Sequence, residues 1–353
     1  MSTFSCPLVE IGKIGCHPNA DLLEITHIAK YPCIIKVGDF KEGDRAVYIP
    51  EEALVPNVPM FQFLWTKRIE QKDIEGNILS VEMRVEENPP ERHRVIWAKK
   101  LRGIFSMGLL VPVPVEFKDL PLGTDLSKQL GIEKYEKPEM MNTGGDNVSP
   151  PGWFHKYTEI EHLRKYDYVL LVGEEVILTE KVHGCCSKYC YNENQLWVGS
   201  HTNTKKDDGK NGWWRVANEL KMEERLKSHP GIIFYGEVYG QVQKGFDYGI
   251  RRGMFDFILF DAFSLANNKY LDEDQFLALA NSVDLKVVPT LYRGPWLGLE
   301  AHEALADGPN TINGKHIREG FVVKPVVERW DPEVGRVILK LVGQEYLLGK
   351  HKR

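Results

Sequence analysis

The chain has 353 residues, of which 42% are hydrophobic and 27% are charged, and its formal net charge is −5. This length suggests two or three domains, and this composition is ordinary for a globular protein. The negative balance excludes nucleic-acid binding through overall charge, so such binding would need a local basic groove. The six cysteines include no CxxC pair, which argues against a zinc ribbon or a disulfide framework and favours reduced, buried thiols.

The N-terminal segment indicates no export signal. It lacks a charged region followed by a long apolar run, and no apolar run in the chain approaches the roughly 20 residues of a membrane span. We therefore expect a cytoplasmic protein without a membrane anchor, and we expect a monomer.

Residues 1–118 read as short strands separated by turns. Gly43 and Gly103 occupy turn or bend positions, and the expected strands cover residues 2–14, 22–28, 33–40, 44–54, 78–87 and 93–113. About five strands at this spacing favour a small barrel of the OB type that binds nucleic acid. A generic β-barrel or sandwich without a ligand is the alternative.

Residues 119–154 are expected to form a linker, because the stretch 137–152 is rich in Pro, Gly, Asn and Ser. Residues 155–353 then favour an α+β domain with mostly antiparallel sheets. A short helix is expected within 157–166, with Thr158 as its N-cap, and longer helices near 212–228 and 271–283. Strands are expected at 167–173, 174–184, 187–200, 231–240, 256–264, 320–326 and 336–342.

An apolar, β-branched run in this second domain ends in a lysine, Lys181, which is followed by His183 and Gly184. A lysine amine has a reference pKa of about 10.4 and is protonated at neutral pH, so a nucleophilic role needs desolvation or nearby cations. Gly184 would let backbone approach a ligand closely. Taken alone, this lysine is more simply explained as a solvated strand-end charge.

Further charged residues stand at the ends of other apolar strands. Glu237 follows one strand, Glu319 and Lys324 flank another, and Lys340 ends a third. Burying such charges is costly unless a polyanion lies between them, and a triphosphate with Mg²⁺ would fit. Phe260, which a core position would also explain, could stack on a base.

The ordered series EKVHG, FYGEVYG, FILFDAF, EGFVVKP and RVILK resembles the motifs of ATP-dependent polynucleotide ligases, which are covalent nucleotidyltransferases. It is most similar to RNA ligases of the phage T4 RNA ligase 2 type. The stretches 9–28, 37–50 and 99–114 resemble the leading OB domain of the Deinococcus-type RNA ligases. The resemblance implies an N-terminal OB barrel followed by an adenylyltransferase domain with an ATP-grasp-like arrangement of antiparallel sheets and helices.

The resemblance also implies a role for each matched residue. Lys181 would attack the α-phosphate of ATP and hold AMP as a phosphoramidate. Glu180 would lie by the adenine through its backbone, next to Gly184 of the same motif, and Phe260 would stack on the base. Glu237 would contact the ribose or a metal-bound water, and Glu319 would bind the catalytic Mg²⁺ or Mn²⁺.

Two further contacts to the nucleotide follow from the matched positions. Lys324 and Lys340 would contact the α-phosphate, and His201 or Ser200 would contact a phosphate or the ribose. The last motif often carries a second lysine, but Val342 stands at that position here. Lys350 and Lys352 in the tail are possible substitutes.

The implied activity is ATP-dependent sealing of 3′-OH and 5′-phosphate RNA ends, at nicks with RNA on the 3′-OH side. The OB domain would hold the duplex near the nick through basic residues and tryptophans, with candidates Lys36, Lys67, Arg68, Lys99, Lys100, Arg102, Trp65 and Trp97. An ATP-dependent DNA ligase or a capping guanylyltransferase is one alternative, although both usually carry an OB domain after the last motif. A non-catalytic RNA-binding protein is the other.

Overall fold

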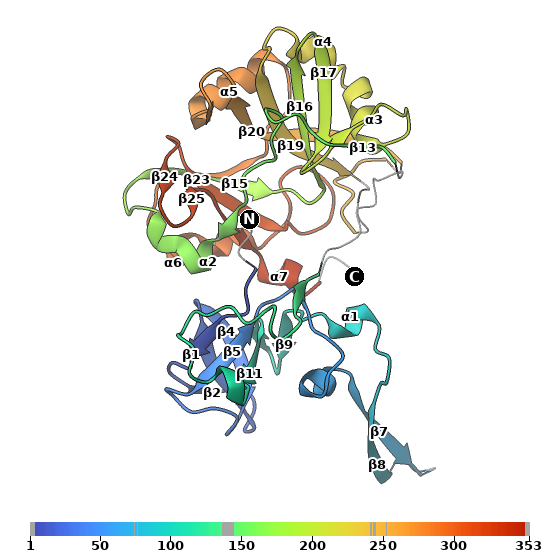
Figure 1. The fold of residues 1–353 in the computed structure, drawn as a ribbon, viewed down its shortest axis with the longest axis vertical. Helices are drawn as coiled ribbons and strands as arrows, with labels where there is room; N and C mark the ends of the chain where they lie inside the picture. The colour runs from blue at the N-terminus through green and yellow to red at the C-terminus, as the bar shows by residue number, and fades with distance from the viewer. Residues whose placement is uncertain are drawn as a thin grey trace. The chain divides into compact units, whose positions relative to one another are not determined.

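The structure is a computed structural model that describes residues 4–73, 75, 77–135, 145–240, 242, 245–251 and 253–349. The chain divides after residue 137 into two compact units, which are described separately (Figure 1). Among the helices of these described ranges, none is long and apolar enough to cross a membrane.

The N-terminal unit is built from short antiparallel strands around an apolar core. The central strand β5 (Arg45–Ile49) lies between β1 (Leu8–Glu10) and β11 (Leu109–Pro112), and its residues are buried from Ala46 to Ile49. The remaining pairings join β2 (Gly15–Cys16), β3 (Leu23–Ile28) and β4 (Tyr31–Lys36); β9 (Lys99–Leu101) and β10 (Ile104–Ser106); β6 (Ala53–Leu54) and β12 (Glu133–Lys134); and β7 (Thr66–Lys72) and β8 (Ile78–Val85). Short helical turns are η1 (Pro59–Leu64), α1 (Glu91–Arg94) and η2 (Val115–Phe117).

This unit extends past residue 118, where the sequence places the start of the linker. Leu126 and Ile132 are buried in the same core as Val47 and Val111, and β12 pairs with β6. Residues 119–135 therefore complete the N-terminal unit. Of the expected linker, residues 136–144 lie outside the described residues, and the following stretch up to the buried Phe154 belongs to the C-terminal unit.

The C-terminal unit contains two sheets. The larger sheet is antiparallel and has seven strands in the order β13 (Asn147–Val148), β18 (Thr204–Lys205), β17 (Gln195–Ser200), β16 (Cys185–Asn192), β19 (Ile232–Gly240), β20 (Phe255–Ser264) and β21 (Lys269–Tyr270). The smaller sheet has five strands in the order β14 (Glu161–His162), β26 (Leu339–Val342), β23 (Gly320–Pro325), β15 (Glu175–Lys181) and β22 (Thr290–Pro295), and only its β14–β26 pairing is parallel among these strands. A small hairpin joins β24 (Trp330–Asp331) and β25 (Gly335–Arg336).

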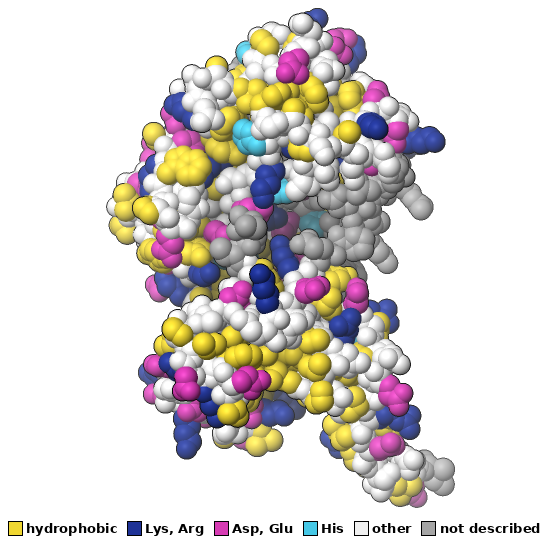
Figure 2. Space-filling model, viewed as in Figure 1, with side chains coloured by type: hydrophobic (Ala, Val, Ile, Leu, Met, Phe, Trp, Pro, Cys, Tyr) yellow, Lys and Arg dark blue, Asp and Glu magenta, His cyan; other side chains and the backbone are white. Residues whose placement is uncertain are grey.

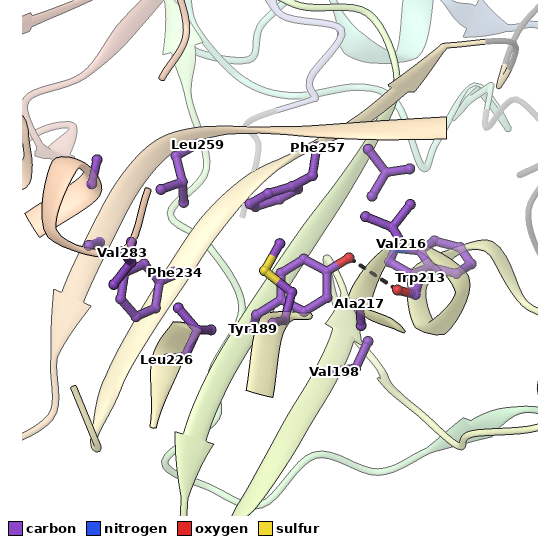
Figure 3. Packing of buried hydrophobic residues seen from close by; sticks show 14 of the residues in the cluster. Tyr189, Val198, Trp213, Val216, Ala217, Leu226, Phe234, Phe257, Leu259 and Val283 are labelled. Carbon is purple, nitrogen blue, oxygen red and sulfur yellow. Dashed lines mark hydrogen bonds between the residues drawn. The ribbon is translucent and has the colours of Figure 1, made fainter. Parts of the chain in front are cut away.

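Helices cover one face of the seven-stranded sheet. They are α3 (Gly212–Glu219), α4 (Met222–Leu226) and α5 (Glu273–Ser282), in the two regions where the sequence predicts helices. Tyr189 and Phe257 on the strands pack against Val216 of α3, and the Tyr189 hydroxyl donates a hydrogen bond to the Trp213 carbonyl (Figure 3). Because side chains alternate along a strand, the neighbouring residues point to the opposite face of the sheet.

Two local predictions are wrong. The helix expected over 157–166 is reduced to α2 (Leu163–Tyr166), so Thr158 is no N-cap and instead lies in a segment without regular secondary structure. The strand expected at 167–173 begins as the helical turn η3 (Asp167–Val169). The other short helical elements are α6 (Leu299–His302), η4 (Glu303–Ala306) and α7 (Gln344–Leu347).

Candidate active site

A pocket of about 220 Å³ opens between the two sheets of the C-terminal unit. Strand alternation determines which side chains reach it. Val176 and Leu178 of β15 point into the core of the smaller sheet, so Thr179 and Lys181 point to the opposite, pocket-lining face. The same alternation on β19 directs Glu237 to the pocket, away from the helix-covered face.

Lys181 lies at the end of β15 in direct contact with Glu319. Its Nζ donates a hydrogen bond of 2.6 Å to Glu319 Oε1, and His183 Nδ1 lies 3.1 Å from Glu319 Oε2. Burial alone would raise the pKa of Glu319, but Lys181 and His183 outweigh burial and lower that pKa to about 2. The carboxylate is therefore ionised at neutral pH and favours the protonated, non-nucleophilic form of the amine.

Glu237 forms a second acidic wall beside Lys181. Burial raises its pKa to about 8, Glu319 adds to this, and Lys181 opposes it. Gly184 lies against the same strand, because a Cβ on Gly184 would stand 2.2 Å from the Val238 carbonyl oxygen and 2.9 Å from Glu237 Cγ. Only glycine permits this approach, which holds Lys181 and Glu237 on the same pocket.

The opposite end of the pocket is apolar and aromatic. Phe260 lines it together with Tyr157, and their ring centroids are 4.9 Å apart in an edge arrangement. Val322 lies on the facing strand. Glu180 also lines the pocket; its Oε2 accepts hydrogen bonds from the Thr311 backbone and hydroxyl, whereas its Oε1 is buried and accepts none from the described residues.

Both further lysines line the pocket, but at different places. Lys340 on β26 pairs with Val322 of β23. On β23, Gly320 pairs with Lys181, whereas Lys324 pairs with Ile177. Lys324 is therefore four residues farther along β23 than the partner of Lys181. Four residues of strand span about 13 Å. The Lys324 ammonium instead lies 3.1 Å from Glu273 Oε2 and 3.5 Å from Asp261 Oδ1, at the aromatic end of the pocket.

The motifs leave open the roles of two positions, which the structure places as follows. Of the two residues at 200–201, His201 lines the pocket, 3.5 Å from Glu159. Burial lowers the pKa of His201, although Glu159 opposes this. Val342 pairs with Gly320, level with Lys181, so an apolar side chain stands where a second lysine is often found. The proposed substitutes Lys350 and Lys352 lie outside the described residues.

Sequence reasoning missed the aromatic residues that hold His183. The Tyr346 hydroxyl of α7 lies 3.1 Å from His183 Nδ1, and the Tyr248 hydroxyl accepts a 2.7 Å hydrogen bond from the His183 backbone. Phe246 packs on the imidazole at 4.3 Å between ring centroids. Tyr346 follows the last motif by only a few residues, but no periodic pattern marks it.

A divalent cation would be held by few protein ligands here. Within the described residues, no three His, Cys, Asp or Glu side chains gather as a complete metal site. Glu319 raises the pKa of Glu237, and both carboxylates lie by Lys181. Two carboxylates with phosphate oxygens and waters are a donor set that suits Mg²⁺ or Mn²⁺, so the residues present fit such an ion.

Comparison with known proteins agrees with this geometry. The RNA ligase family model matches residues 174–342, which span both sheets of the pocket, and an OB-fold domain model matches residues 8–113. The predicted fold, an OB-fold domain followed by an RNA ligase nucleotidyltransferase domain with antiparallel sheets, is confirmed.

Solved structures with this fold cover nearly the whole chain. A variant of the Naegleria gruberi RNA ligase with ATP and Mn is 24% identical with a TM-score of 0.79, covering 99% of this chain and 100% of that one. The Naegleria gruberi RNA ligase with PPi is 23% identical with a TM-score of 0.78, covering all of both chains. Protein Early 65 kDa of Autographa californica nuclear polyhedrosis virus is 28% identical over 87 residues, which are 24% of this chain and 16% of that protein.

Proposed function

We propose that the protein is an ATP-dependent RNA ligase that seals 3′-OH and 5′-phosphate ends through a lysyl-AMP intermediate on Lys181. The observation that carries this proposal is the Lys181 amine, in contact with Glu319 and near Glu237, in a pocket with an aromatic end. The match of residues 174–342 to the RNA ligase model supports it, as do the ATP and Mn in the similar Naegleria structure.

In the first step, neutral Lys181 Nζ would form a bond to the α-phosphorus of ATP. The bond from that phosphorus to the oxygen bridging to the β-phosphate breaks, pyrophosphate leaves, and the amine releases a proton. In the resting site Lys181 donates a hydrogen bond to Glu319, which favours the ammonium form, so one further proton must leave Nζ before the attack. If Glu319 turned to a divalent cation, the carboxylate that favours the ammonium would be removed, and this first proton would pass to solvent.

The second and third steps transfer and then release AMP. An oxygen of an RNA 5′-phosphate would attack the phosphorus of lysyl-AMP, so that the P–N bond breaks and an adenylylated 5′ end forms. A neighbouring 3′-OH would then attack the 5′-phosphorus, AMP leaves, and a phosphodiester closes the strand. All three are in-line displacements at phosphorus, in which positioning and charge neutralisation supply the rate.

Glu237 and Glu319 would hold the divalent ion, and Lys340 would contact the α-phosphate. Bound Mg²⁺ or Mn²⁺ would neutralise charge on the phosphate oxygens. His201 would contact the ribose or a phosphate. Lys324 also lines the pocket, and its place beside Asp261 favours a role at the base end over the α-phosphate contact that the motif implies.

The aromatic end of the pocket would hold the adenine. Phe260 would stack on the purine, and Val322 would cover the other side. Glu180 would lie by the adenine through its backbone, because its side chain is buried and its Oε2 accepts hydrogen bonds from Thr311.

We propose RNA as the partner, at a nick with RNA on the 3′-OH side, and a monomer acting in the cytoplasm. Within the RNA ligases, the motif series and the leading OB domain favour the T4 RNA ligase 2-like branch of Deinococcus type. An ATP-dependent DNA ligase or a capping guanylyltransferase would use the same lysine chemistry.

Incubation with α-labelled ATP or GTP and Mg²⁺, followed by a denaturing gel, tests the proposal. We expect label from ATP, none from GTP, and none in Lys181→Ala. Label from GTP alone would point to capping, and no label from either nucleotide would favour a non-catalytic RNA-binding protein. Comparable sealing of all-DNA nicks and of nicks with RNA on the 3′-OH side would favour a DNA ligase.

A further inference from the structure

The N-terminal unit has a groove of its own, about 470 Å³ in volume. It lies at the base of the β7–β8 hairpin, which projects from the rest of the unit (Figure 1). The walls come from η1, α1, β9 and the hairpin, and all of the lining residues belong to this unit. The groove is therefore distinct from the nucleotide pocket.

Aromatic side chains in this groove are left partly in water. Phe63 is 55% exposed and Trp97 is 37% exposed, although both are large apolar groups. The Trp97 indole is held in place by an edge contact to Tyr135, at 5.9 Å between centroids, and by a hydrogen bond from its Nε1 to the Arg92 carbonyl. A fixed, exposed aromatic face in a hollow is a stacking surface.

Trp65 forms a buried part of the groove wall, since its side chain is 3% exposed. The surface that could stack on a base is therefore supplied by Trp97 and Phe63, the two exposed aromatic side chains.

Positive charge surrounds these aromatic residues. Lys67, Arg92 and Lys99 line the groove, and its acidic lining residue Glu86 lies 3.0 Å from His93 Nδ1 and 3.7 Å from Lys67 Nζ. The Lys67 side chain is 67% exposed. In a chain with a net charge of −5, this groove is the local basic site that nucleic-acid binding would require. Figure 2 shows basic and acidic side chains interspersed with hydrophobic ones on this unit.

We propose that the groove binds one or two unpaired nucleotides of a nucleic-acid strand, with bases stacked on Trp97 and Phe63 and phosphates on Lys67, Arg92 and Lys99. In a duplex the base faces are already stacked on one another, so exposed aromatic residues gain nothing from it. The groove would therefore hold an unpaired stretch of the substrate rather than the duplex. This deepens the proposed function, because it names the form of RNA that the N-terminal unit binds.

The geometry also distinguishes among the basic residues of the sequence. Lys99 lines the groove, whereas Lys100, its neighbour on β9, points to the other side of the strand. Lys36, Arg68 and Arg102 do not line it either. The proposal therefore predicts that Lys99 contributes to binding and that Lys100 contributes less.

Binding of a labelled 12-nucleotide oligo(U) to the full-length protein, followed by fluorescence anisotropy in EDTA without ATP, tests the proposal. Trp97→Ala should weaken binding about tenfold, which is the loss of one base stack, and Trp97→Phe should retain most of the affinity. Lys99→Ala should weaken binding and reduce the slope of log affinity against log salt concentration by about one, as expected for the loss of one phosphate contact. Trp330→Ala, which removes a tryptophan that is 70% exposed in the other unit, and Lys118→Ala, an exposed lysine outside the groove, are matched controls without effect.

Two results would overturn the proposal. One is wild-type affinity in both Trp97→Ala and Lys99→Ala, with folding verified by thermal melts. The other is equally tight binding of a blunt duplex of the same length. Because the binding measurement needs no ATP, it tests the groove even if labelling of Lys181 fails. Successful labelling of Lys181 would not support the groove proposal if this binding measurement contradicted it.

Discussion

The nucleotide pocket and the N-terminal groove both combine aromatic residues with cations, but the charges are largely buried in the pocket and exposed to solvent in the groove. In the pocket, Lys181 and Glu319 are 2.6 Å apart and largely withdrawn from water, so each strongly affects the protonation of the other. In the groove, cations such as Lys67 project into solvent, where salt screens them. The first arrangement suits chemistry on one small ligand, and the second suits sequence-tolerant binding of a polyanion.

The largest expected effect is the loss of Glu319. Glu319→Ala should lower the rate of lysyl-AMP formation by about 10²-fold or more, because it removes both the contact to Lys181 and a proposed metal ligand. Single-turnover labelling with ATP measures this rate. If Glu319 affected Lys181 as weakly as exposed charges in the groove affect one another, Glu319→Ala would keep more than a tenth of the wild-type rate.

Removing the aromatic end of the pocket should act on ATP binding instead. Phe260→Ala should raise the KM for ATP about tenfold, since one base-stacking contact is lost. Phe260→Trp retains an aromatic face and serves as the conservative comparison. An unchanged KM for Phe260→Ala would show that Phe260 is a core residue and that it does not stack on the base of ATP.

Tyr346 offers a finer test of how the pocket is held together. Tyr346→Phe removes the hydroxyl that lies 3.1 Å from His183 Nδ1 and should slow lysyl-AMP formation by up to about tenfold, the effect of one hydrogen bond. The KM for ATP should change little. Tyr168→Phe, which removes an exposed hydroxyl bound to Glu333, is the matched control. Equal rates for the two variants would show that His183 needs no such support.

The smallest expected effect concerns stability. Burial lowers the pKa of Lys188 to about 8 from an ordinary value near 10.5. The folded protein therefore releases this proton at lower pH than the unfolded chain, so wild-type stability rises relative to Lys188→Met as pH increases through 8. The gain should be about 1 kcal/mol between pH 7 and pH 9. Urea denaturation at both pH values measures it, and Lys118→Met controls for the loss of one surface charge.

Residues tied to strand ends could be predicted from the sequence, and those fixed by tertiary contacts could not. The apolar runs ending in Lys181 and Lys340 led directly to the pocket wall. The local sequence does not show that Lys324 lies four residues along β23 from the residue paired with Lys181. Nor does it show that the Lys324 ammonium lies beside Asp261 and Glu273. That placement depends on strand register.

The same limit applies to segments whose composition misleads. Residues 119–135 look like the start of a linker, yet Leu126 is fully buried in the N-terminal core. The 157–166 segment has helix-forming residues, but residues 157–160 have no regular secondary structure and line the pocket, where Tyr157 donates a hydrogen bond to the buried Asp261. In both cases tertiary burial outweighs local propensity.

Mapping the site of AMP attachment tests the central claim most directly. After incubation with ATP and Mg²⁺ and removal of free nucleotide, proteolytic peptides analysed by mass spectrometry at neutral to alkaline pH should carry one AMP, on Lys181. The adduct should disappear in Lys181→Arg, which keeps the positive charge. An AMP adduct on any other residue, or no adduct while RNA ends are still sealed, would contradict the account.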